Sequence, residues 1–127
     1  MTPDRDALVH AVGQAIVADP AVSDGAFDGY ALVVAYDGDT RRLSGFRYTD
    51  GAEPVAATPR SPALESALDA LRDATRVDDR APWDACVVRI ERPSNRITIE
   101  FAYGDDAARW AITPAQLAEV ADRARPG

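Results

Sequence analysis

Large apolar residues recur at every second position in the segment between the two tryptophans of this chain. The alternation covers residues 86–91 and 97–103, and turn-forming residues from Pro93 to Asn95 separate the two runs. This period of two, bounded by turn residues, predicts a half-buried antiparallel hairpin. Its inward side carries Cys86, Val88, Ile90, Ile97, Ile99, Phe101 and Tyr103.

Two earlier strands are predicted in the first half of the chain. Tyr30 to Tyr36 is a compact apolar run, and Leu43 to Thr49 places Phe46 and Tyr48 on one side. Residues 37–39, Asp-Gly-Asp, supply the turn chemistry between them. These two strands therefore form a second hairpin.

Three predicted helices begin with the same motif, a hydroxyl residue followed by proline. The hydroxyl caps a free backbone N–H, and proline costs nothing at the first helical position. The pairs are Thr2-Pro3, Ser61-Pro62 and Thr113-Pro114, the last with Gln116 at the spacing of a capping box. Apolar stripes of helical spacing follow: Leu8, Val9, Val12 and Ile16; Leu64, Leu68 and Leu71; Leu117 and Val120. Proline ends the first helix at Asp19-Pro20.

The order helix, two strands, helix, two strands, helix predicts an α+β fold with one four-stranded antiparallel sheet. We expect three helices, packed mainly on one face of that sheet. The proline-rich stretch Gly51 to Pro62 reads as an extended connection inside the domain. Residues 1–127 fit a single domain, because one core typically serves about 100 to 200 residues.

The net charge of the chain narrows the classes of partner that it can bind. The formal net charge is -7, from 21 acidic and 14 basic residues, and every basic residue is arginine. Nucleic acids are bound through clustered basic residues, so an acidic chain without a basic run is not expected to bind them. No apolar run approaches the ~20 residues of a membrane span, and no signal peptide is recognisable. We expect a cytoplasmic protein without a membrane partner.

No motif for catalysis or cofactor binding is found. The single histidine, His10, lies beside the stripe of the first helix, and the single cysteine, Cys86, lies on the inward side of a strand. Neither zinc binding nor a nucleophile with its base is expected from these two residues. Asp37 and Asp39 lack the later ligands of a calcium loop, and no glycine pattern fits phosphate. We therefore expect no catalytic residue, no metal, no cofactor and no enzymatic activity.

The two tryptophans allow two interpretations. Trp83 and Trp110 each flank a predicted element, and each has polar neighbours. Such a side chain seals the edge of a core, or it serves as an energetic anchor in a protein interface, where Trp is enriched.

Several of these motifs together resemble the YezG-like immunity proteins of bacterial polymorphic toxin systems. The similarity covers most of residues 7–125. It is carried by Pro82-Trp83 before the strand Cys86 to Glu91, by the strand ending Phe101-Ala102-Tyr103, by the strand Tyr30 to Tyr36, by Phe46 to Tyr48 with Asp50-Gly51 behind it, and by Trp110 leading into Thr113-Pro114.

The resemblance implies a non-enzymatic, cytoplasmic protein that binds and neutralises a cognate toxin domain, often a nuclease. We expect a monomer whose loop carboxylates Asp37, Asp39, Asp105 and Asp106 face the toxin, with Trp110 as an anchor. An alternative from another class is a secretion chaperone for an effector protein, which is also small and acidic. Such chaperones usually work as dimers with exposed hydrophobic grooves.

Overall fold

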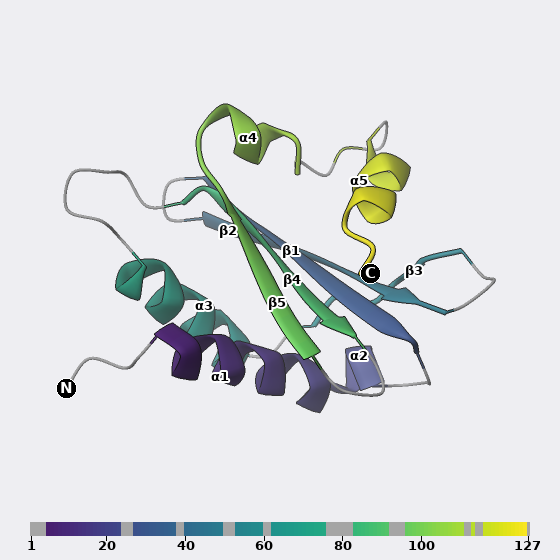
Figure 1. Cartoon of the computed structure of the whole chain (residues 1–127), viewed down its shortest axis with the longest axis horizontal. Coiled ribbons are helices and arrows are strands. Elements are labelled where there is room, and N and C mark those ends of the chain that lie inside the picture. The colour runs from purple at the N-terminus through teal and green to yellow at the C-terminus, as the bar shows by residue number, and fades with distance from the viewer. Residues whose placement is uncertain are drawn as a thin grey trace.

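A computed structural model describes residues 5–23, 27–37, 40–49, 53–59, 62–75, 83–91, 96–110, 113 and 116–126. Within these ranges, one antiparallel sheet has the strand order β3-β2-β1-β4-β5 (Figure 1). The strands are β1 Gly29–Asp37, β2 Thr40–Tyr48, β3 Val55–Ala56, β4 Ala85–Glu91 and β5 Arg96–Ala102. The helices are α1 Arg5–Ala18, α2 Pro20–Ser23, α3 Pro62–Ala74, α4 Asp105–Ala108 and α5 Leu117–Arg123.

The two predicted hairpins are confirmed, and they join through their inner strands. β1 pairs with β2 from Gly29↔Tyr48 to Asp37↔Thr40, and it also pairs with β4, where Leu32 faces Val88. β4 and β5 pair with each other along their whole length. The turn residues 38–39 and 92–95 lie outside the described ranges.

The prediction of four strands and three helices is wrong in number. The added strand β3 lies inside the stretch interpreted as a connection, and it pairs with β2 at Phe46↔Ala56 and Arg47↔Val55. Two residues are too few to produce a periodic pattern, so the sequence gives no signal for β3. The helices α2 and α4 are also too short to produce a periodic pattern, so they were not predicted.

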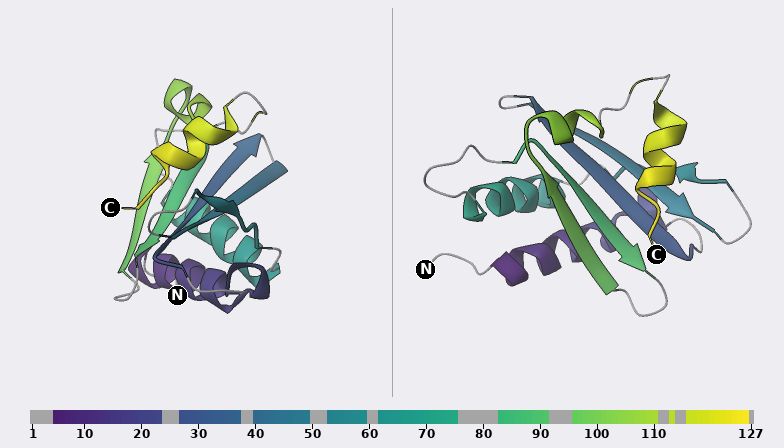
Figure 2. Two further views of the ribbon diagram at one scale, coloured as in Figure 1. Left: turned by 90° about the vertical axis from the view of Figure 1, so that its right-hand side faces the viewer. Right: turned by 45° about the horizontal axis from the view of Figure 1, so that its top comes forward.

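The helices cover both faces of the sheet, which corrects the prediction of helices mainly on one face. Figure 1 and Figure 2 show α1 and α3 on one side of the sheet and α4 and α5 on the other. Both faces of β1 are apolar, with Leu32 and Val34 in one core and Ala31 and Val33 in the other. A strand buried on both faces reads as a continuous apolar run rather than an alternation.

The larger core lies between the sheet and α1 with α3. It buries most of the two predicted stripes: Leu8, Val12 and Ile16 of α1 and Leu64, Leu68 and Leu71 of α3. Val9, the remaining member of the first stripe, is partly buried against this core. Trp83 closes this core at one end. Its ring meets Tyr36 edge-on, with ring centroids 5.3 Å apart, and its indole N–H donates a hydrogen bond to Thr75 Oγ1 at 2.8 Å. The interpretation of Trp83 as a seal of the core is confirmed.

The smaller core lies between the sheet and α5. It combines small side chains on the central strands with three aromatic rings, and it consists of Ala31, Val33, Phe46, Tyr48, Ala85, Val87, Ala102, Trp110, Val120, Ala121 and Ala124. The hydroxyl of Tyr48 donates to the carbonyl oxygen of Ala121 at 2.5 Å and so joins β2 to α5.

The predicted helix ends can be compared where the residues are described. α1 ends at Ala18, as expected from Asp19-Pro20, while Thr2, Pro3 and Ser61 lie outside the described ranges. α5 begins at Leu117, with Gln116 as its N-cap and no side-chain cap, so it starts later than the predicted position at Thr113-Pro114. The Thr113 hydroxyl accepts a hydrogen bond from the backbone N–H of Gln116 at 3.2 Å, the spacing of a capping box. No helix in the described part of the chain is long and apolar enough to cross a bilayer.

Candidate functional site

Asp84 organises the end of the sheet at which β1 and β5 end and β4 begins. Its backbone N–H donates to the carbonyl of Ala102 at 2.9 Å, and its backbone carbonyl accepts from the N–H of Tyr36 at 2.7 Å. Its side-chain carboxylate accepts from the N–H of Gly104 at 2.9 Å. Three strands and the following turn are thereby held together by one residue.

Gly104 sets the direction of α4, which carries two of the predicted site residues. Its φ of 54° is a left-handed conformation that favours glycine. The chain turns there, and Asp105 and Asp106 follow in the first turn of α4, both exposed. Carboxylates in the first turn of a helix interact favourably with the free backbone N–H groups, so these positions also favour the turn.

Further carboxylates approach the same end from α3. Asp69 accepts hydrogen bonds from the hydroxyl of Tyr36 at 2.8 Å and from the Arg41 guanidinium at 2.5 Å. Asp73 lies beside it in a shallow polar pocket that Tyr36 and Arg72 also line. Burial, followed by the hydrogen bond to Asp69, raises the pKa of Tyr36 above its ordinary value.

We call this region the carboxylate end; its described carboxylates are Asp69, Asp73, Asp84, Asp105 and Asp106. Two nearby arginines are engaged within the fold. Arg41 pairs with Asp69, and Arg72 donates from Nε to the carbonyl of Trp83 at 2.9 Å while its guanidinium lies 4.2 Å from the centre of the Tyr36 ring.

The predicted site residues divide into three groups. Asp105 and Asp106 lie at the carboxylate end, and the backbone of Asp37 ends β1 at the same end. Asp39 and the side chain of Asp37 lie outside what the structure describes. Trp110 is 4% exposed and belongs to the smaller core, so its indole offers little surface to a partner. A partner-binding role for these residues remains a prediction.

Arginines surround the Trp110 ring. Arg89 and Arg123 lie with their guanidinium carbons 5.8 Å and 5.7 Å from its centre, and Arg109 lines the same pocket of about 380 Å³. Arg89 already donates to three partners: Glu100 and the carbonyls of Arg123 and Ala124. The cluster therefore holds α5 in place, and Glu100 on its rim lowers its attraction for anions.

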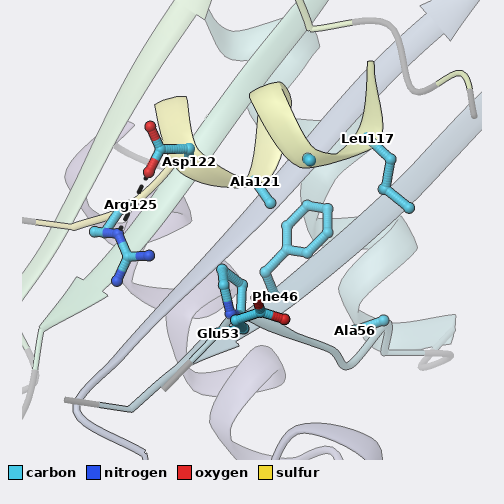
Figure 3. A pocket seen from close by; sticks show the side chains of 9 residues that line it. Phe46, Glu53, Ala56, Leu117, Ala121, Asp122 and Arg125 are labelled. Carbon is cyan, nitrogen blue, oxygen red and sulfur yellow. Dashed lines mark ion pairs between the residues drawn. The ribbon is translucent and has the colours of Figure 1, made fainter. Parts of the chain in front are cut away.

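A groove of about 480 Å³ lies between α5 and the β2–β3 edge of the sheet. Figure 3 shows the ring of Phe46 pointing toward α5 from below, with Leu117 and Ala121 above it. The remaining lining residues are Glu53, Pro54, Ala56, Ala118, Asp122 and Arg125. Arg125 pairs with Asp122 at 3.8 Å and lies 5.0 Å from the centre of the Tyr48 ring.

Leu117 is 45% exposed, which corrects its assignment to a core-facing stripe. The stripe holds for Val120, which is buried. Leu117 stands one turn earlier, at the start of α5 and beside the outer strands, where the groove opens. Sequence analysis identified neither the exposure of Leu117 nor the role of Asp84 in joining the strands.

Cys86 and His10, the single cysteine and the single histidine of the chain, have different surroundings. Cys86 is fully buried in the larger core, and burial raises the pKa of its thiol above the ordinary value. His10 is exposed on α1 and lies 2.9 Å from the side-chain amide of Gln14. Among the described residues, no three His, Cys, Asp or Glu side chains converge in a geometry that could hold a metal ion.

Comparison of the chain with protein-family models and with curated proteins finds no significant match.

Proposed function

We propose that this chain is an immunity protein, which binds a cognate bacterial toxin domain and neutralises it by direct protein–protein contact. The toxin domain we expect is a nuclease. The resemblance to the YezG-like family suggests this function, and the distribution of charge in the fold supports it.

The strongest support is the set of exposed carboxylates at the carboxylate end of a chain whose net charge is -7. Asp105 and Asp106 stand on a turn that Gly104 and Asp84 fix by a hydrogen bond of 2.9 Å. Charges held on a rigid frame lose little entropy when a partner binds. A nuclease is basic around its substrate channel, so fixed carboxylates speed its encounter with the inhibitor and compete for the phosphate path.

The size of the chain is compatible with a stable complex. A standard interface buries about 1,600 Å² in total, or about 800 Å² on each partner. The accessible surface of this chain is 7546 Å², so such an interface covers roughly a tenth of it.

Co-expression tests the proposal directly. If the gene next to that of this chain encodes a candidate toxin domain, that domain is expressed in bacteria alone, with the wild-type chain, and with an unrelated acidic protein of similar size. We expect growth arrest with the toxin domain alone, recovery with this chain, and no recovery with the acidic control. Equal arrest with and without this chain would refute the proposed function.

One observation favours the secretion-chaperone alternative: the groove beside Leu117 is largely apolar and open to solvent. Exposed apolar grooves are typical of proteins that hold an effector segment. Light scattering of the purified chain separates the two candidates, because the chaperone is expected to be a dimer. A monomer at micromolar concentration favours the immunity function.

A further inference from the structure

The sheet is open at β3. Among the described strands, β3 pairs with β2 on one side and has no neighbour on the other, while α5 overhangs the same edge and forms the groove. An open edge presents backbone N–H and C=O groups that can pair with an added strand. The opposite edge strand, β5, carries Arg96, Thr98 and Glu100 on its exposed side.

The large apolar side chains that the described residues leave exposed both flank this edge. Leu117 is 45% exposed at the mouth of the groove, and Val55 is 51% exposed on β3 itself. Ala56 pairs with Phe46 and lines the groove with it, so Val55, the neighbouring residue, points to the other face of the sheet. One exposed apolar residue therefore lies on each face of the same edge.

This arrangement matches an extended segment, whose successive side chains point to opposite faces. A helix lying in the groove would reach Leu117 but not Val55. Charge defines the segment further, since the carboxylates of Glu53 and Asp122 line the groove. Arg125 is held by Asp122 and by the Tyr48 ring. A partner segment that carries lysine or arginine beside its apolar residues would therefore complement both the charge and the apolar surface of the groove.

A second copy of this chain fits the edge poorly. Each copy carries a net charge of -7, so edge-to-edge pairing would bring two acidic surfaces together. A basic partner gains from the same charges.

We propose that the β3 edge, with Leu117 and Val55, receives an extended segment of the toxin domain that alternates apolar residues with Lys or Arg. The inference rests on the proposed function and adds the place and the form of the contact. The segment runs along β3, and its apolar side chains cover Leu117 on one face and Val55 on the other.

Thiol protection tests the contact. Leu117→Cys and Val55→Cys are each labelled with a maleimide, free and in complex with the purified toxin domain, and Glu119→Cys on the same helix is the matched control. The native Cys86 is fully buried and does not compete for the reagent. We expect labelling at positions 117 and 55 to slow at least tenfold in the complex, with an unchanged rate at position 119.

A charge variant gives an independent measurement. Leu117→Arg is expected to weaken toxin binding at least about tenfold, because it removes the apolar contact and repels a basic segment. Glu119→Arg, which changes the charge by more, is expected to have the smaller effect. Both sites are exposed, and thermal unfolding of each variant checks that the fold is kept.

The outcomes separate the two proposals. If no complex forms with the wild-type chain, the proposed function fails and the edge contact fails with it. If a complex forms while positions 117 and 55 are labelled as fast as in the free chain, or position 119 is equally protected, the edge assignment alone is wrong. A dimer of the free chain protected at both positions would mean that a second copy occupies the edge.

Discussion

The Nε of Arg89, on the inner strand β4, donates a hydrogen bond of 3.0 Å to the carbonyl oxygen of Ala124, just beyond the last residue of α5. Its other nitrogens reach the carbonyl of Arg123 at 3.3 Å and Glu100 at 3.1 Å. The last carbonyls of a helix lack partners within the helix and attract a positive charge. Arg89 therefore anchors the helix that forms one wall of the groove.

Arg89→Ala is expected to destabilise the fold by about 2 to 3 kcal/mol, because hydrogen bonds of a charged, mostly buried group are lost together. Arg89→Lys keeps the charge but not the planar fork of donors, so it is expected to recover only part of the loss. Urea unfolding of both variants measures the change. Arg96→Ala, at an exposed position of β5, is the control and should stay within about 0.5 kcal/mol of wild type.

Gly45 holds the β3 segment against β2. Its carbonyl accepts from the N–H of Ala57 at 2.8 Å, and its N–H donates to Thr58 Oγ1 at 3.2 Å. A Cβ at this position would lie 1.9 Å from the Tyr30 hydroxyl and 2.3 Å from the Ala57 carbonyl oxygen. That hydroxyl donates to the same carbonyl at 2.7 Å, so the space is occupied by a buried hydrogen bond.

Gly45→Ala is thus expected to cost about 2 to 3 kcal/mol and to displace β3. Tyr30→Phe removes the hydroxyl and should cost about 1 kcal/mol. The double variant should not return to the stability of Tyr30→Phe, because the Ala57 carbonyl still blocks the new methyl group. Full recovery in the double variant, seen in urea unfolding, would show that the hydroxyl alone excludes a side chain.

Tyr48 makes stability depend on pH in the alkaline range. Burial raises the pKa of Tyr48 from 10.0 to about 12. The unfolded chain then loses this proton at lower pH than the folded chain, so the contribution of neutral Tyr48 is complete below about pH 10 and is lost as pH rises toward about 12. Burial also raises the pKa of Tyr30 and Tyr36, which adds to the same trend.

Tyr48→Phe is expected to be less stable than wild type at neutral pH, because the hydrogen bond to Ala121 is lost. Between about pH 10 and 12, however, its stability should decline less steeply than that of wild type. Unfolding midpoints in urea across this range measure both effects. Parallel declines of the two proteins would contradict the assignment to Tyr48.

The two hairpins and the longer helices could be predicted from sequence because their patterns are local and repeat over several residues. The alternation around Val88 and the stripe from Leu64 to Leu71 each report burial at every second or every third to fourth position. The edge strand at Val55 could not, since its pairing depends on Gly45, ten residues earlier. The same holds for Leu117, whose exposure depends on where α5 crosses the sheet.

Charge neutralisation at the carboxylate end tests its part in toxin encounter. Asp105→Asn with Asp106→Asn is expected to slow association several-fold at low salt and to flatten its dependence on salt, with little effect on dissociation. Asp6→Asn with Glu119→Gln changes the charge equally at exposed positions on other elements and is the control. Stopped-flow or biolayer interferometry gives both rates. Equal slowing by the two pairs would assign steering to overall charge rather than to this end.

The proposed immunity function requires that the surface of this chain neutralises a toxin domain without chemical turnover. Titration of the purified toxin domain with the chain, with residual toxin activity measured at each step, tests this most directly. Activity should fall linearly and vanish at equimolar chain, and intact, active toxin should be recovered after the complex is dissociated. Inactivation by a small fraction of an equivalent, or no inhibition at a large excess, would contradict the account.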